Sequence, residues 1–186
     1  MKKLLYIILV AAVAPLLSSC LGDDDNNSDT YKEWREQNDQ WMQLRLAEKD
    51  ASGNPVYQKV TANWDTKAYV LMKWHNDRSQ TIGNLQPIST STVDVKYEVM
   101  TIDSTLIDSS KDRVTPAQGV YRTVLNKNIT GWMMGIPQMH IGDSCTILIP
   151  YNQAYGNVTS NGLKPYSSLI FNVKLVGIPA YEKPVN

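Results

Sequence analysis

Residues 128–156 constrain the fold of this chain more than any other stretch. They open with a segment, Asn128 to Met134, that is too short to be stable as an isolated helix but can make two turns when a sheet covers it. Gly135 suits the left-handed position that commonly ends a helix. The stretch therefore predicts a short helix that depends on packing against a larger element.

The second half of this stretch predicts a buried strand and then a corner. Gly142-Asp143 marks a turn, and from Cys145 to Ile149 every second side chain is apolar and falls on one face, as in a strand. Ala154-Tyr155-Gly156 then leaves the strand for a loop. A short helix carrying Trp132, followed by such a strand and a Tyr-Gly corner, predicts the floor and wall of an apolar cup.

Length and charge narrow the class of protein. The chain has 186 residues, enough for one domain with a real core. It carries 18 basic and 18 acidic residues, so there is no basic excess to attract nucleic acid, and we expect no nucleic-acid partner.

The arrangement resembles the FK506-binding-protein family of peptidyl-prolyl isomerases, over about Thr92 to Ile178. Each matching motif is weak alone, but their order is specific. The motifs are Val95-Lys96-Tyr97, Asp108-Ser109-Ser110, Ile129-Thr130-Gly131-Trp132, Gly135 to Gly142, Ile149-Pro150, Ala154-Tyr155-Gly156 and Leu169 to Leu175.

The resemblance implies a fold and a site. The fold is α+β, with an antiparallel sheet of five or six strands wrapped around the short helix. The implied active site has Trp132 as the floor of a proline pocket, a substrate-binding backbone amide at Ile129, and aromatic and charged groups around them. The full set implied is Tyr97, Asp108, Arg113, Ile129, Trp132, Tyr155 and Phe171 as catalytic residues, with Ile107, Asn128 and Tyr166 as further substrate-binding residues.

The sequence also departs from the family pattern. Ile107 stands where the family usually has Phe, and Ala117 replaces a second pocket aromatic. Both changes predict a more open pocket. Two residues are inserted around Gln118 to Asn126, and Lys164-Pro165-Tyr166 stands where Pro-Pro is common.

The chain begins with a predicted lipoprotein signal, residues 1–19. Lys2-Lys3 precede an apolar run, and Leu17-Ser18-Ser19-Cys20 resembles the bacterial lipoprotein cleavage box, which makes Cys20 the lipidated first residue of the mature protein. The apolar run is shorter than the roughly 20 residues that a membrane span requires. We therefore expect a lipid-anchored envelope protein, on the periplasmic or the cell-surface face of the outer membrane.

A polar tether and an extension separate Cys20 from the resembling region. Residues 20–29 have too little apolar surface to fold. Their Asp23-Asp24-Asp25 run resembles a surface-export signal of Bacteroidetes lipoproteins, or is simply a solvated linker. Residues 30–91 are expected to pack on the domain and to add strands to its sheet, and residues 179–186 to form a tail.

Within this extension, a helix is expected to run from Thr30 to near Lys49. Thr30 and Glu33 form the pattern of a capping box. The expected buried face carries Tyr31, Trp34, Trp41 and Leu44, interrupted by Asn38. Val56 to Val60 and Ala68 to His75 are the strand candidates that follow.

Covalent and metal chemistry find no support in the sequence. His75 and His140 are isolated and have no nearby ligand partners, so we expect no metal and no cofactor. Cys145 lies in an alternating strand and reads as a buried apolar residue rather than a nucleophile. The reaction that remains is rotation about an Xaa-Pro bond, which requires none of these groups.

The expected function is thus prolyl isomerisation in proline-containing envelope or surface proteins. Two alternatives stay open: a peptide-binding or chaperone module that lost catalytic rate through Ile107 and Ala117, and a structural lipoprotein whose aromatic cup is packed shut.

Overall fold

The computed structural model describes residues 30–160 and 162–181. The expected signal (residues 1–19), the lipidated Cys20 and the tether to residue 29 lie outside the described residues, as do residues 182–186 of the expected tail. Among the described residues, no helix combines the length and the apolar character that a membrane crossing requires.

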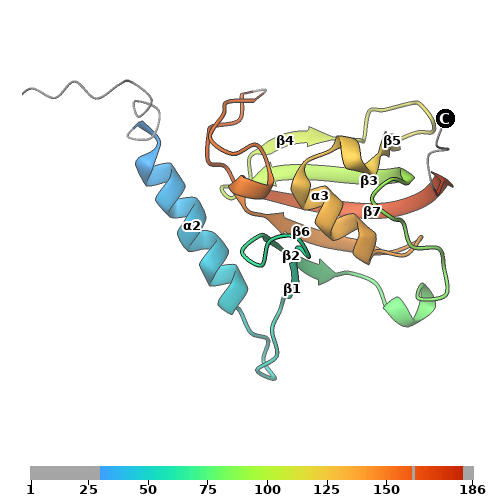
Figure 1. Ribbon diagram of the computed structural model, residues 1–186, viewed down its shortest axis with the longest axis horizontal. Coiled ribbons are helices and arrows are strands. Elements are labelled where there is room, and N and C mark those ends of the chain that lie inside the picture. Colours follow the sequence, from blue (N-terminus) through green and yellow to red (C-terminus); the bar gives the residue numbers. More distant parts are fainter. Residues whose placement is uncertain (1–29, 161, 182–186) are drawn as a thin grey trace, which may run out of the picture.

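One antiparallel sheet of seven strands organises the molecule, one strand more than the upper limit expected from the sequence (Figure 1). Its order is β1-β2-β6-β7-β3-β4, and β5 also pairs with β3. The strands are β1 (Gln58–Thr61), β2 (Tyr69–Trp74), β3 (Thr92–Thr101), β4 (Leu106–Ser109), β5 (Tyr121–Val124), β6 (Ser144–Ile149) and β7 (Leu169–Ala180). The expectation that the region before residue 92 adds strands to this sheet is confirmed, because β2 pairs with β6 and β1 with β2.

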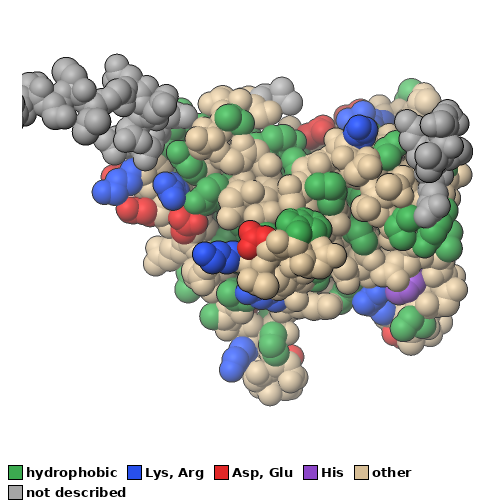
Figure 2. All heavy atoms as spheres, in the orientation of Figure 1, with side chains coloured by type: hydrophobic (Ala, Val, Ile, Leu, Met, Phe, Trp, Pro, Cys, Tyr) green, Lys and Arg blue, Asp and Glu red, His purple; other side chains and the backbone are tan. Residues whose placement is uncertain are grey.

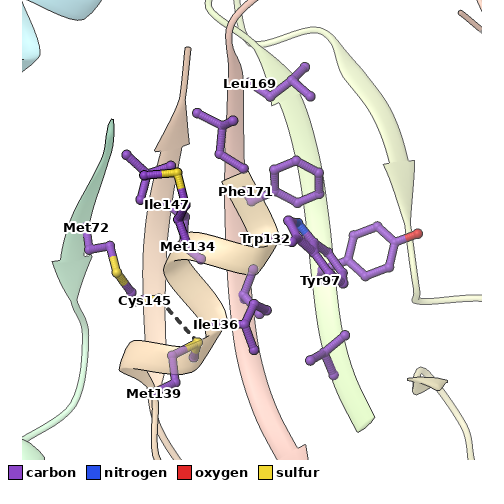
Figure 3. Close-up of a cluster of buried hydrophobic side chains, with 14 of the residues drawn as sticks. Met72, Tyr97, Trp132, Met134, Ile136, Met139, Cys145, Ile147, Leu169 and Phe171 are labelled. Carbon is purple, nitrogen blue, oxygen red and sulfur yellow. Dashed lines mark hydrogen bonds between the residues drawn. The ribbon is translucent and has the colours of Figure 1, made fainter. Parts of the chain in front are cut away.

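The short helix α3 (Thr130–Gly135) lies across one face of the sheet (Figure 1). Two glycines allow its close approach to β6. A Cβ on Gly131 would lie 2.4 Å from Cγ2 of Ile149, and one on Gly135 would lie 3.0 Å from Cδ1 of Ile147. The main core fills the space between α3 and the sheet, and Figure 3 shows part of it.

Gly135 does not adopt the left-handed conformation that the sequence suggested. Its φ is −84°, and the chain continues from α3 directly into the short 3₁₀ helix η3 (Ile136–Gln138). The glycine is needed here for its lack of a side chain, because Ile147 occupies the adjacent space.

The longer helix α2 (Lys32–Ala47) covers part of the opposite face of the sheet. Its Met42 packs against Leu71 of β2 and Leu148 of β6, which are paired in register. Charged side chains are interspersed over its exposed side (Figure 2). Both faces of β6 are therefore buried, one by α3 and the other by α2.

Helix α2 differs from the sequence expectation at its start and along its face. Its N-cap is Tyr31 rather than the expected Thr30, and the Tyr31 side chain makes no capping hydrogen bond. Leu44, expected on the buried face, is 58% exposed, whereas Asn38 is fully buried. The helix packs through a polar residue because loop backbone as well as apolar sheet surface lies beneath it.

The remaining short 3₁₀ helices lie in the connections between these elements. They are η1 (Arg78–Gln80), η2 (Leu125–Lys127) and η4 (Tyr151–Gln153).

Candidate functional site

A concave pocket of about 690 Å³ lies between α3, the sheet and the loop after β6. It receives all but one of the ten residues proposed for the site from the sequence. Those nine are Tyr97, Ile107, Asp108, Arg113, Asn128, Ile129, Trp132, Tyr155 and Phe171. The alternative of an aromatic cup packed shut is wrong, because this pocket is open space.

Aromatic rings form the floor of the pocket. Trp132 of α3 is 3% exposed, and its ring centroid lies 5.5 Å from that of Tyr97 and 5.4 Å from that of Phe171, both edge to face (Figure 3). Tyr97 pairs in register with Val173 of β7, so Phe171 is its diagonal neighbour on the same face of the sheet. The β3–β7 register and the seating of α3 together place these three rings in contact.

Tyr97 lies where two strands meet along one edge of β3. Strand β5 pairs with β3 up to Val95, and β4 pairs from Glu98 onward. Ser110 holds the backbone at this junction: its hydroxyl accepts from the Tyr97 amide at 2.9 Å, and its own amide donates to the Tyr97 carbonyl at 2.9 Å. The Asp108-Ser109-Ser110 motif thus brings Asp108 beside the Tyr97 side chain.

A cluster of three polar side chains, Tyr97, Asp108 and Arg113, borders the aromatic floor. The Tyr97 hydroxyl donates to Oδ2 of Asp108 at 2.5 Å, and Arg113 donates to the same hydroxyl at 3.4 Å. The Arg113 guanidinium lies 3.9 Å from the Asp108 carboxylate. Burial and the hydrogen bond to Asp108 raise the pKa of Tyr97 to about 12, so its hydroxyl keeps its proton at neutral pH.

The residues before α3 position a backbone amide at the pocket. The Asn128 side chain donates to the carbonyl oxygens of Val124 and Leu125, at 2.9 and 3.2 Å, which fixes the chain entering the helix. The next residue, Ile129, is extended, with φ −60° and ψ 152°. Within the described part of the chain, no hydrogen bond engages the Ile129 amide. This amide can therefore donate to a ligand.

Tyr166 is the one proposed site residue that does not line the pocket. Its φ is +60°, and its ring packs edge to face on Tyr151 with centroids 5.5 Å apart. The guanidinium of Arg35 in α2 lies 5.2 Å from the Tyr166 ring. Tyr166 is a contact between the loop and α2 because the left-handed turn directs its side chain away from the pocket.

Tyr121 is the site residue that sequence reasoning missed. It lines the pocket from β5, and its centroid lies 5.7 Å from that of Tyr97 and 6.3 Å from that of Trp132. Arg113 lies 4.5 Å above its ring. Ala117, by contrast, is exposed. The available signal was an aromatic residue four positions beyond Ala117, where the second pocket ring was sought.

Other pocket residues were also missed, most of them on loops or at strand ends. They are Val99, Lys127, Ser160, Leu163 and Leu169. The first and the last face the core from neighbouring strands that pair near the end of the sheet. The three others lie on connections, where alternation gives no signal.

His140 and Cys145 do not line the pocket. His140 lies 3.1 Å from the Arg78 guanidinium and 3.6 Å from the buried Asp143 carboxylate, in a polar cluster away from the pocket. Among residues 30–160 and 162–181, no group of three or more potential ligands is placed to hold a metal ion. Cys145 is fully buried, and burial raises the pKa of its thiol to about 12, so it is not a nucleophile at neutral pH.

The fold and the pocket together define a class of protein, in which an antiparallel sheet packs on a short helix and an aromatic-floored pocket has a hydrogen-bonded polar rim. Residues 83–176 match the family model of the FKBP-type peptidyl-prolyl cis-trans isomerase domain. The chain belongs to this family.

Two bacterial relatives show the same similarity. The chain is 37% identical over 98 residues to a probable FKBP-type peptidyl-prolyl cis-trans isomerase FkpA of Neisseria meningitidis, which covers 52% of this chain and 35% of the relative. It is 34% identical over 93 residues to the FKBP-type 22 kDa peptidyl-prolyl cis-trans isomerase of Escherichia coli, covering 50% and 43%. The chain therefore matches less than half of the length of these relatives.

A solved structure supports the fold. The crystal structure of a peptidyl-prolyl cis-trans isomerase from Pseudomonas syringae superposes with a TM-score of 0.61, covering 80% of this chain and 95% of that chain at 20% identity.

Proposed function

We propose that this chain catalyses cis–trans isomerisation of Xaa-Pro peptide bonds, with the proline ring seated on the indole of Trp132. The observation that carries this proposal is the joining of two features in one pocket. These are an aromatic floor, in which Trp132 contacts the rings of Tyr97, Tyr121 and Phe171, and the Tyr97–Asp108–Arg113 group at its edge. Family membership supports the same activity.

The physical problem is the barrier of about 18–20 kcal/mol that amide resonance sets against rotation. In the proposed mechanism, the apolar floor removes water from the bound amide. This favours the twisted state, because an amide that has lost its resonance is less polar and loses less on leaving water. The Ile129 amide donates to a substrate carbonyl beside the pocket and holds the chain. The carboxylate of Asp108, positioned by Tyr97 and Arg113, faces the rotating carbonyl and favours its altered charge.

The proposed clients are proline-containing proteins of the bacterial envelope or surface, and the proposed anchor is a lipid on Cys20. The support is the box Leu17-Ser18-Ser19-Cys20 after an apolar run. Each buried acyl methylene contributes about 0.8 kcal/mol to membrane affinity. The test is Cys20→Ala followed by cell fractionation: loss from the membrane fraction supports lipidation, and a processed, mature-length species that stays there contradicts it.

The activity is tested with a protease-coupled assay on a short Xaa-Pro peptide, using the full chain. Acceleration above the spontaneous rate supports the proposal. Binding of the same peptide without acceleration would instead favour a peptide-binding module. The observation that favours a peptide-binding module is Ile107, a half-buried aliphatic side chain in the pocket wall.

A further inference from the structure

Helix α2 contacts two elements: the sheet and the loop that completes the pocket. We call residues 150–168 the pocket loop, of which residue 161 is not described. Three of its residues line the pocket: Tyr155, Ser160 and Leu163. The loop runs from the end of β6 to the start of β7, so both its ends lie beside the strands that α2 covers.

The end of the pocket loop next to β7 is fixed by hydrogen bonds to α2, one of which is buried. Asn38 of α2 is fully buried, and its Oδ1 accepts from the backbone amide of Ser168 at 2.7 Å. The Asn38 Nδ2 donates to the Trp34 carbonyl at 2.8 Å, which orients the amide so that its oxygen faces the loop. One turn earlier, the Trp34 indole Nε1 donates to the hydroxyl of Ser167 at 2.9 Å.

The other end of the loop is held by the same helix. Arg35 donates to the Tyr151 hydroxyl at 3.2 Å and lies over the Tyr166 ring. Tyr166 closes the loop on itself, because its amide donates to the Gly156 carbonyl at 2.8 Å. The contacts of α2 therefore lie at the two bases of the segment that carries Tyr155, Ser160 and Leu163.

We propose that α2 is a positioning element for the substrate pocket and that Asn38 is its central positioning residue. By holding the two bases of the pocket loop, α2 sets where the loop wall stands relative to the rings of Trp132 and Tyr97. The residues involved are more than a hundred positions apart in the sequence, and Trp34 and Asn38 lie outside the segment that matches the family model. The expected effect of α2 on turnover rests on the proposed function, whereas its expected effect on the position of the pocket loop does not.

The test compares the wild-type full chain with three variants. Asn38→Ala removes the buried acceptor. Trp34→Phe removes only the indole donor and keeps an aromatic ring, so it serves if Asn38→Ala fails to fold. Arg45→Met is the matched control: Arg45 lies on the same helix but pairs with Glu48 and Trp41, away from the loop.

Two readouts separate positioning from general stability. Hydrogen exchange of the backbone amides of residues 155–168 reports local opening of the loop. Kinetics on an Xaa-Pro peptide report KM and kcat separately. Because one lost hydrogen bond changes an equilibrium by about twofold to tenfold, we expect KM to rise by that factor in Asn38→Ala and Trp34→Phe. We also expect faster loop exchange, kcat within about twofold of wild type, and an unchanged Arg45→Met control.

Three results would overturn the proposal: unchanged loop exchange and KM in the folded α2 variants, an equal rise of KM in Arg45→Met, or a fall in kcat with KM unchanged. If the wild-type chain shows no turnover, the proposed function fails. Loop exchange and the dissociation constant of the peptide then decide the role of α2 on their own.

Discussion

The two halves of the pocket are held in different ways. The half formed by the sheet and α3 has a floor of rings that pack on one another, of which Trp132 is 3% exposed. The half formed by the pocket loop carries Tyr155, which is 43% exposed, and depends on polar contacts with α2. The rings of the first half belong to the hydrophobic core, whereas the second half anchors in that core through Leu163 and otherwise consists of more exposed residues.

Because of this difference, we expect the two halves of the pocket to contribute differently to rate and to affinity. Groups packed in the core keep a fixed geometry, which catalysis of a rotating bond requires. A wall on a loop contributes area and excludes water, and it can be displaced without unfolding the domain. We therefore expect substitutions in the sheet half to change stability or rate, and substitutions in the loop half to change affinity.

The largest expected effect follows from Gly131→Ala. The added methyl would lie 2.4 Å from Cγ2 of Ile149, so α3 must move away from β6. We expect urea denaturation to show a loss of about 1–3 kcal/mol in unfolding free energy, together with loss of activity. Gly83→Ala is the control, since a Cβ there meets nothing within 4 Å. Equal stability of the two variants would contradict the close packing of α3.

Trp132→Leu should keep the fold and remove the floor. A large apolar residue still caps the core, but the flat contact with the proline ring is lost. Since one aromatic contact is worth up to about 1.5 kcal/mol beyond the area that it buries, kcat/KM should fall about tenfold or more, through both affinity and rate. Circular dichroism checks the fold, and wild-type kinetics in a folded variant would show that the site lies elsewhere.

Asp108→Ala should reduce mainly the rate. Its carboxylate would act on the twisted carbonyl more than on the bound ground state, so kcat is expected to fall by about threefold to tenfold with little change in KM. Asp94→Ala is the matched control, because Asp94 also pairs with an arginine, Arg122, but does not line the pocket. A change confined to KM would contradict a role for Asp108 in the transition state.

Tyr155→Ala tests the loop half. Because the ring is partly exposed and lies on the pocket loop, we expect KM to rise about threefold while kcat stays within about twofold of wild type. Tyr181→Ala removes a ring of the same exposure, 43%, that does not line the pocket, and should change neither constant. A loss of kcat in Tyr155→Ala would erase the distinction between the two halves.

Ile107→Phe has the smallest expected effect. An aromatic ring at this half-buried position would enlarge the wall and better exclude water from the rotating amide, which we expect to raise kcat/KM by about twofold. The gain is small because Tyr121 already supplies a ring in this region. Leu106→Phe, at the exposed neighbouring position, should leave the kinetics unchanged. An unaltered rate in Ile107→Phe would mean that the wall is already complete.

The sequence predicts the sheet half of the pocket well, because the order of its motifs resembles that of a known family. The resemblance assigns Tyr97, Trp132 and Phe171 to one site, and the structure brings these three rings into contact. Tyr121 was missed because it lies four residues beyond Ala117, the position where a second ring was sought. Ala117 does lack the aromatic ring usual in the family, but the pocket wall is not missing, because Tyr121 lines it.

The loop half was beyond sequence reasoning for a physical reason. Asn38 interrupts an apolar stripe and so reads as a defect in a packed face. Its partner, the amide of Ser168, lies 130 residues away, and no periodicity connects the two. Tyr166 was assigned to the pocket by the family resemblance, but a positive φ turns its side chain toward α2.

Exchange spectroscopy by NMR on a short Ala-Pro peptide, with a substoichiometric amount of the full chain, tests the catalytic role of the pocket most directly. Uncatalysed isomerisation takes tens to hundreds of seconds, so exchange peaks between the cis and trans signals appear only when the bond is catalysed. We expect such peaks with the wild-type chain and their strong reduction with Trp132→Leu. Peptide signals that shift on binding but show no exchange with the wild-type chain would contradict catalysis and leave a binding pocket in its place.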